Sequence, residues 1–169
     1  MMILLSLPMM AQEEDSTPQK PLVKFGFLSY EAALKAMPEY EAVQQHMESL
    51  RTAFQTEMQR VEDEFNRKYE DFLEGQKDFP RTILLKRQTE LQEMLQRNLQ
   101  FKQQSLDELK QTEKELLTPL SNRLNETIAT IAYEQELALV VNTDANACPF
   151  INPQFGVDLN MIVLQQIAK

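Results

Sequence analysis

The strongest constraint on this chain is a helical spacing of apolar residues that runs through its middle. From Tyr40 onward, apolar and aromatic side chains recur at steps of three or four residues, at Val43, Met47, Leu50, Phe54, Met58, Val61, Phe65, Tyr69 and Phe72. The mean step is about 3.6 residues, the period of an α-helix. The order of steps repeats roughly every 11 residues, which gives a nearly straight seam. The spacing predicts a helix from Glu39 to Gln76, about 57 Å long.

A break of a few residues separates this helix from a second one. Gly75 and Pro80 are typical of a helix end followed by a new start. The apolar period then resumes and continues to roughly Gln135, at Leu84, Leu91, Leu95, Leu99, Leu106, Leu109, Leu116, Leu120, Leu124, Ile128 and Ile131. Pro119 lies inside this pattern and is a candidate for a kink. Two long helices joined by so short a break can only fold back on each other, so we expect an antiparallel hairpin, an arm of residues 39–135.

The segment before the arm begins with a strand pattern. Val23 to Leu28 alternates apolar and aromatic residues with others, which predicts a short strand. Ser29 is a good cap for a short helix that runs through Met37. This segment, residues 23–38, is expected to join residues 136–169 in one small body.

The segment after the arm indicates more β-structure and a last helix. Leu137–Val141 is a short apolar run of strand type, and a polar turn separates it from Phe150–Ile151. The two runs predict a β-hairpin. Asp158 is expected to cap a final helix, Leu159–Ile167. The predicted fold class is α+β, mostly α, with the body made of both chain ends and the arm of the middle.

The first residues match the pattern of a secretory signal peptide. An apolar run from Ile3 to Met10 ends at the small residue Ala11 and turns acidic, so residues 1–11 are expected to be cleaved after Ala11. Residues 12–22 are polar and predict a disordered linker. No Lys or Arg precedes the apolar run. Two alternatives therefore stay open, a start upstream of Met1 and an apolar N-terminus on a cytosolic protein.

An arm only two helices thick cannot bury both sides of its helices, so part of its apolar surface is expected to stay exposed. The candidates lie off or at the edge of the simple stripe: Phe72, Leu73, Phe79, Ile83, Leu85, Met94, Phe101 and Leu117. Exposed apolar groups on a solvated arm usually mark a contact surface. The alternative is that they widen the seam or pack within an oligomer.

Charge is distributed unevenly along the arm. Residues 41–75 carry four basic and nine acidic side chains, whereas residues 76–102 carry six basic and three acidic ones. The far end of the arm is therefore basic, through Lys77, Arg81, Lys86, Arg87 and Arg97. Such a tip suits anionic lipid head groups or acidic polypeptide segments. A plain solvated helix surface is the alternative.

The sequence offers little for catalysis or for nucleic-acid binding. His46, the one histidine, lies among polar neighbours in the first long helix, and Cys148 is the one cysteine, so no intramolecular disulfide forms. No glycine-rich phosphate loop, metal-ligand cluster or nucleophile–base set stands out. The net charge of −9 disfavours nucleic acid as a partner. We expect a non-enzymatic protein without a cofactor.

Both ends of the chain resemble a known family. Lys24 to Tyr40, KFGFLSYEAALKAMPEY, resembles the opening of the Skp (OmpH-like) periplasmic chaperones, in which a short strand runs into a helix ending M-P-E-Y and then a long charged helix. LALVVNTDA and FINPQFGVDLNMIV resemble that family's closing strands and terminal helix, including Asn152, Pro153, Asp158 and Leu159. The resemblance covers Val23 to Lys169, with its specificity in the two ends.

The resemblance implies an assembly. In this family three subunits join their strands into a β-barrel body, and three helical tentacles enclose a cavity that holds unfolded outer-membrane β-barrel proteins without ATP. By position, the trimer body would be built by Val23, Phe25, Phe27, Leu139, Val141, Phe150 and Ile151. The cavity would be lined or edged by Phe65, Phe72, Phe79, Ile83, Leu95 and Phe101. A body this small buries too little surface to stand alone, which agrees with assembly.

One departure from the family concerns charge. Skp-type proteins are often basic, whereas this chain has a sequence pI near 4.7 and only its arm tip is basic. The expected function is nevertheless that of a periplasmic, ATP-independent holdase. The alternatives are a structural coiled-coil scaffold of the cell envelope and, with less support, a prefoldin-like cytosolic holdase.

Overall fold

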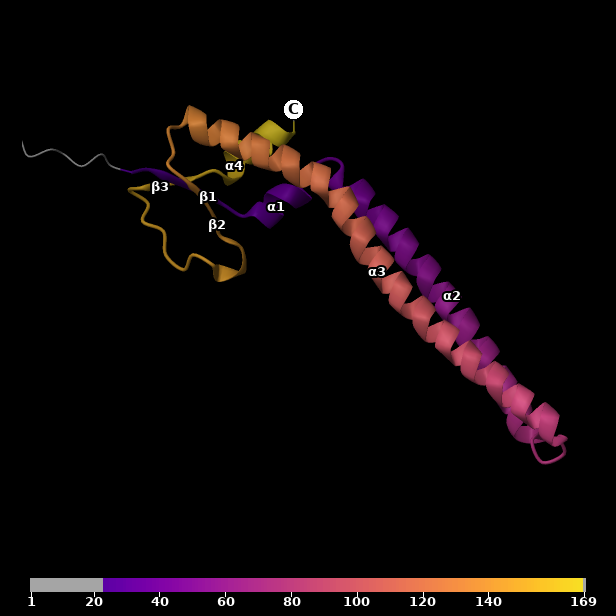
Figure 1. Ribbon diagram of the computed structural model, residues 1–169. Coiled ribbons are helices and arrows are strands. Elements are labelled where there is room, and N and C mark those ends of the chain that lie inside the picture. Colours follow the sequence, from indigo (N-terminus) through magenta and orange to yellow (C-terminus); the bar gives the residue numbers. More distant parts are fainter. Residues whose placement is uncertain (1–22, 169) are drawn as a thin grey trace, which may run out of the picture.

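A long two-helix arm projects from a small body at one end of the molecule. The computed structural model describes residues 23–168, and Figure 1 shows the strands, α1 and α4 gathered at the root of the arm. The arm consists of α2 (Tyr40–Gly75) and α3 (Arg81–Glu134), which pack side by side in opposite directions. These bounds agree within a residue or two with the helices expected from the apolar spacing, and the antiparallel hairpin is confirmed.

The turn between the two helices depends on a glycine and a proline. Asp78 N donates to the Gly75 carbonyl oxygen (3.0 Å), which closes the end of α2, and Pro80 caps the start of α3. A Cβ atom on Gly75 would lie 2.8 Å from Cε1 of Phe79. The missing side chain therefore lets the Phe79 ring fold back over the end of α2.

The helix α3 is longer than α2 and continues over the body. Its 54 residues span about 80 Å, against about 54 Å for α2. Pro119 lies inside α3, and Figure 1 shows the helix changing direction where it leaves α2 for the body. Because proline lacks an amide hydrogen and crowds the preceding turn, it accounts for a bend at this point.

The hydrophobic core lies in the body and at the root of the arm. Its buried members come from β1, from the four α-helices of the described chain and from the residues next to α1 and α4: Leu28, Ala33, Met37, Val43, Met47, Leu120, Leu124, Ile131, Leu159, Val163 and Ile167. The apolar face of the last helix, α4 (Asn160–Ile167), packs against the end of α3 in this core. The core therefore fixes the root of the arm and leaves its outer part without a comparable anchor.

The sheet corrects the expected β-hairpin. β1 (Phe25–Leu28) lies between β2 (Val140–Asn142) and β3 (Gly156–Asp158), and both neighbours run parallel to it, with Gly26 opposite Val140 and Val157. The segment Phe150–Ile151 is not a strand; it belongs to the connection between β2 and β3, and Phe150 is 77% exposed. The hairpin prediction was wrong because it paired the two segments after the arm with each other. In the structure β1 is the central strand, and β2 and β3 each pair with one of its two edges.

Polar side chains at the end of β2 explain why the chain does not turn straight back. Ser29 caps α1 (Tyr30–Lys35) by accepting from Ala32 N (3.1 Å), as expected. The Asp144 carboxylate accepts from Ser29 Oγ (2.6 Å) and from Glu31 N (2.8 Å). These two bonds tie the residues after β2 to the start of α1, so the chain leaves the sheet before it returns as β3.

The start of α4 differs slightly from the expectation. Asp158 is the last residue of β3, and Leu159 occupies the cap position. The Asp158 carboxylate still accepts from Asn160 N (2.9 Å). It therefore satisfies one amide of the first turn of α4, although it lies one residue before the cap position.

Two sequence expectations lie outside the described residues, namely the signal peptide of residues 1–11 and the linker of residues 12–22. Within residues 23–168, no helix combines the length and the apolar character that crossing a bilayer requires.

Candidate binding surface on the helical arm

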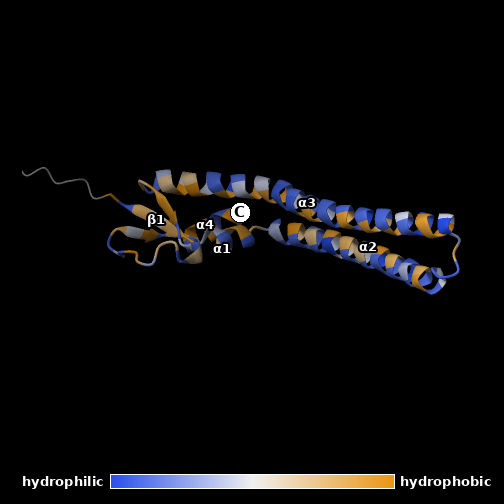
Figure 2. Ribbon diagram, turned by 60° about the horizontal axis from the view of Figure 1, so that its bottom comes forward, coloured by the Kyte–Doolittle hydropathy of each residue, from blue (hydrophilic) through white to orange (hydrophobic). Residues whose placement is uncertain are grey.

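The outer part of the arm is poorly buried. On α2, Val43 and Met47 are buried near the root, and among the described residues beyond them only Phe72 is buried on this helix. On α3 the first buried side chain after Arg81 is that of Ser105, followed by Leu120. The two helices thus meet along a seam of half-buried groups, and Figure 2 shows apolar residues recurring along the whole length of both helices.

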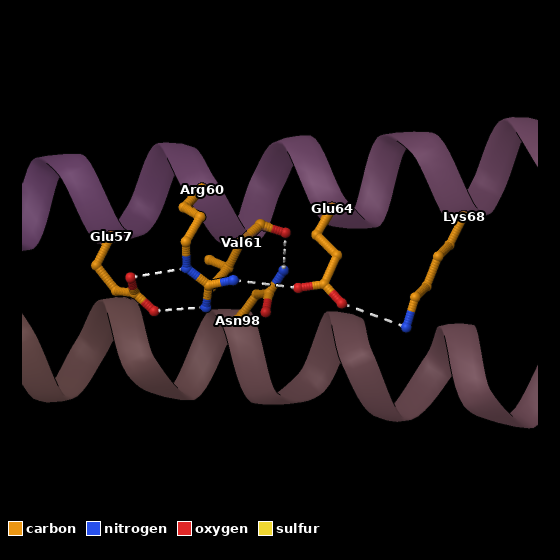
Figure 3. Close-up of polar contacts among 6 residues, drawn as sticks. All are labelled: Glu57, Arg60, Val61, Glu64, Lys68 and Asn98. Atoms are coloured by element: carbon orange, nitrogen blue, oxygen red, sulfur yellow. Dashed lines mark hydrogen bonds and ion pairs between the residues drawn. The ribbon is translucent and has the colours of Figure 1, made fainter.

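Polar groups of α3 occupy the middle of this seam. Asn98 Nδ2 donates across it to the Val61 carbonyl oxygen of α2 (3.1 Å), as Figure 3 shows. The buried Ser105 hydroxyl donates to the Phe101 carbonyl oxygen (2.8 Å), and the Phe101 ring meets Phe54 edge-on at 6.2 Å between centroids. The face of α3 that carries Asn98, Phe101 and Ser105 is therefore the one that faces α2.

The leucines next to that face are left in solvent. Leu95, Leu99 and Leu106 are 47%, 60% and 45% exposed. Their steps of four and seven residues place them on one face of α3. We call these three residues the leucine stripe. The apolar spacing gave no sign that Leu99 and Leu106 would be exposed, because it does not tell which of two adjacent faces of α3 meets α2. Leu95, which was expected to line the cavity, lies on the same exposed face.

The six residues expected to line a binding cavity fall into two groups. Ile83 is exposed, like Leu95, whereas Phe65, Phe79 and Phe101 are half-buried and Phe72 is only 9% exposed. Phe65 stacks on Tyr69 of its own helix, with 6.0 Å between ring centroids. The sequence prediction missed Leu99, Leu106 and Tyr69 as exposed apolar groups, although the spacing of the leucines was visible.

A ladder of charges runs along α2 on the side facing α3. Figure 3 shows Arg60 between Glu57 and Glu64, at 2.7 Å and 3.3 Å, and Lys68 beyond Glu64 at 3.3 Å. The hydrogen bond from Arg60 lowers the pKa of the Glu57 carboxyl, and that from Lys68 lowers the pKa of the Glu64 carboxyl. All these groups are solvated, so the ladder contributes little to stability and mainly keeps the helix face polar.

The basic tip is partly neutralised by its own helix. Lys86 and Arg87 lie 3.7 Å and 3.4 Å from Glu90, and Arg97 lies 3.8 Å from Glu93. Lys77 and Arg81 are exposed and have no ion pair within residues 23–168. Contact between the tip and anionic lipid head groups stays a prediction.

A hollow of about 430 Å³ lies between α2 and α3 near the tip. Its apolar lining comes from both helices and the turn, namely Phe72, Phe79, Leu91 and Met94; these side chains are buried or half-buried, and we call them the floor. The rest of the lining is charged and exposed, and we call it the rim: Lys68, Asp71, Arg87, Glu90, Glu93 and Arg97. We call this hollow the tip pocket; it brings together Phe72 and Phe79, which the sequence placed on one candidate surface.

The body offers a second apolar surface. β2 and β3 each pair with β1 alone within the described residues, so one edge of each strand is unpaired. Three of the residues expected in an oligomer interface are exposed, namely Val23, Leu139 and Phe150, while Phe25, Phe27, Val141 and Ile151 are half-buried. Tyr133, at the end of α3, is also exposed and was not expected. An unpaired strand edge flanked by apolar side chains is a template for another chain.

No group of three or more His, Cys, Asp or Glu side chains in residues 23–168 is arranged to hold a metal ion. His46 is exposed on α2, as expected.

Comparison with known proteins identifies the fold class first. A solved structure from Caulobacter crescentus, described as "a putative outer membrane chaperone (OmpH-like)", matches this chain with a TM-score of 0.67 and 16% identity. The match covers 89% of this chain and 85% of that one. It shows that the small sheet with a helical-hairpin arm is a fold already known in a solved protein.

The family follows from the sequence. The model of the family described as outer membrane protein (OmpH-like) matches residues 24–167. This chain therefore belongs to the OmpH-like family, which confirms the resemblance drawn from its two ends. No curated protein matches the chain.

Proposed function

We propose that this protein is a periplasmic holdase chaperone, which binds unfolded outer-membrane proteins (its clients) along its arm and keeps them from aggregating without ATP. The observation that carries the proposal is the leucine stripe. Its three large apolar side chains are exposed to solvent on α3, whereas polar side chains of the same helix, such as Asn98, face α2. An exposed apolar row of this kind marks a contact surface. Membership of the OmpH-like family and the fold shared with the Caulobacter chaperone support the proposal.

The proposal includes a homotrimer. Each subunit has two unpaired strand edges, on β2 and β3, and exposed apolar groups beside them. If β2 of one subunit meets β3 of the next, the contact is heterologous, and a rotation of one third of a turn per subunit would close it as a ring of three. Three such contacts would complete a barrel and place three arms around a common space, in which a client meets several leucine stripes at once.

The test is aggregation of a urea-unfolded outer-membrane porin, measured by light scattering after dilution with and without the purified chain. We expect the chain to suppress scattering, and we expect the triple variant Leu95→Ser/Leu99→Ser/Leu106→Ser to lose most of that suppression. The matched control is Gln96→Ser/Gln100→Ser/Gln104→Ser, because it places the same helix-weakening residue at three exposed polar positions of α3. Full suppression by the leucine variant would contradict the role of the stripe.

A structural scaffold of the cell envelope is the second candidate. It has the same arm but fixed partners, so it predicts no suppression of porin aggregation by a correctly assembled trimer. Sedimentation of the chain separates assembly from activity. A monomer at micromolar concentration would contradict the trimer, and a trimer inert toward unfolded porin would favour the scaffold.

A further inference from the structure

We propose that the tip pocket holds one aromatic side chain of an unfolded client while the client's backbone lies across the charged rim. This inference rests on the proposed holdase function and adds to it a defined site and a preferred residue type. The tip pocket and the leucine stripe share no residue: the pocket lies between the two helices, whereas the leucines of the stripe are exposed on α3.

The floor of the pocket suits a ring. Phe72 comes from α2, Phe79 folds back over Gly75, and Met94 comes from α3, so two aromatic groups and one sulfur-containing group from three segments line the pocket. Aromatic rings gain from edge-on or offset contact with other rings, and thioethers make favourable contacts with ring edges. A volume of about 430 Å³ is near the lower end of the range of ligand cavities, so it suits one large side chain better than a folded partner.

The rim suits a polypeptide backbone better than a phosphate group. Three basic and three acidic side chains surround the opening, so the rim has no net charge. A lipid phosphate near Arg87 or Arg97 would also meet the carboxylates of Glu90 and Glu93, which partner those arginines. An extended backbone presents amide donors and carbonyl acceptors in alternation, and the two kinds of rim group can satisfy both.

The proposed clients carry the matching residues. Outer-membrane β-barrels have girdles of aromatic side chains at both membrane interfaces, and their strands alternate apolar with polar residues. In the unfolded chain, each girdle residue is an aromatic side chain flanked by backbone and polar neighbours. A guanidinium at the rim, such as that of Arg87, can add a cation–π contact with the bound ring.

The test uses the full chain and a ten-residue peptide of Ser, Thr and Gly with one central Trp. The protein has no tryptophan, so the peptide's emission reports burial of its indole alone. We expect a blue shift on binding, and a Kd about threefold to tenfold weaker for Phe79→Ala, the range expected for the loss of one aromatic contact. Leu85→Ala is the matched control, because Leu85 is exposed on the same end of α3 but does not line the pocket.

The place of binding is read from the methionine methyl groups of the 13C-methyl-labelled chain. The Trp peptide should move the Met94 resonance upfield through its ring current and leave that of buried Met47 unchanged, whereas a peptide with Ala in place of Trp should move neither. An unmoved Met94 resonance at millimolar peptide overturns the inference. So does a Met94 shift with vesicles of anionic lipid and none with the peptide, which would make the pocket a lipid site.

The light-scattering assay distinguishes this inference from the function on which it rests. If the chain suppresses porin aggregation but Met94 does not respond to the Trp peptide, the holdase function stands and the aromatic pocket is wrong. If suppression fails as well, both are wrong. Circular dichroism of Phe79→Ala verifies that the arm remains helical, so that a weaker Kd reports the pocket.

Discussion

At the scale of single residues, Gly26 and Asn98 are each constrained by residues that lie far from them in the sequence. Gly26 lies in β1, and the space where its side chain would stand is filled from two directions by Leu159 and Leu137. Asn98 is the one side chain of α3 that donates a hydrogen bond across the seam to the backbone of α2 within the described residues. Position 26 therefore favours a residue without a side chain, and position 98 favours a hydrogen-bond donor.

Gly26→Ala should destabilise the body. The new Cβ would lie 2.6 Å from Cδ1 of Leu159 and 2.9 Å from Cδ1 of Leu137, so the core must shift, at a cost of about 1–3 kcal/mol. Urea unfolding followed by circular dichroism measures the loss. Gly75→Ala is the control, since a Cβ there would meet only the half-buried Phe79 ring at the tip and no residue of the core. Equal losses for both variants would contradict this account.

Asn98→Ala should loosen the middle of the arm. Loss of the bond to the Val61 carbonyl oxygen costs about 1 kcal/mol, equivalent to about fivefold faster hydrogen exchange of the amides near Val61. Hydrogen-exchange mass spectrometry measures this on the intact protein. The control Gln100→Ala alters an exposed residue two positions away and should leave exchange unchanged. Unchanged exchange in Asn98→Ala would show that the cross-seam bond does not hold the helices together.

At the scale of elements, one carboxylate contributes two of the hydrogen bonds that attach the start of α1 to the residues after β2. Asp144 lies just after β2 and satisfies Ser29 Oγ and the Glu31 amide at the start of α1. The Ser29 hydrogen bond, followed by that of the Glu31 amide, lowers the pKa of the Asp144 carboxyl from its ordinary value of 3.8. Acid should therefore loosen the contact between the sheet and α1.

Asp144→Asn should change how stability depends on pH. A carboxyl with a lowered pKa in the folded state contributes stability above its ordinary pKa, and this contribution is lost as pH falls through the lowered value. The variant should have a lower Tm than the natural protein at pH 6, and the difference should shrink as pH falls below about 3.8. Calorimetric scans between pH 6 and pH 2 measure it. The control Asp78→Asn removes an exposed carboxylate at the arm's turn without touching this network, and a difference that grew in acid would refute the role of Asp144.

At the scale of the whole molecule, the residues that stabilise the fold and the residues proposed to bind clients lie at opposite ends. The buried core lies in the body and the root of the arm, whereas the leucine stripe and the tip pocket lie beyond it. Because the outer arm buries few apolar groups, it contributes little to global stability. The arm can thus present apolar surface to a client without weakening the core that holds the molecule together.

A variant in which a short Gly/Ser turn replaces residues 54–101 should test this division. It removes the tip pocket together with Leu95 and Leu99 of the leucine stripe, and it keeps the core residues at the root, namely Val43, Met47, Leu120 and Leu124. We expect the Tm and the sedimentation behaviour of the natural protein to be retained, and suppression of porin aggregation to be lost. Retained suppression would place client binding in the body, and a collapse of the oligomer would show that the outer arm contributes to assembly.

The elements of the arm and the family were determined by the sequence itself. The spacing from Val43 to Phe72 and the break between Gly75 and Pro80 give both long helices nearly at their observed bounds, because helix period and helix ends are local properties. The hairpin follows from the shortness of the break. The strand and short helix at Lys24–Tyr40 are local in the same sense, and they carried the resemblance to the OmpH-like family.

Only the tertiary structure decided which surfaces are covered. The choice of β1 as a central strand with two parallel neighbours depends on pairing across more than 100 residues, which leaves no local pattern in β2 or β3. The choice of Asn98 and Ser105 over Leu99 and Leu106 for the seam depends on what α2 presents opposite them. Periodicity places side chains on a face of a helix, but only the packed partner determines whether that face is buried or left to bind.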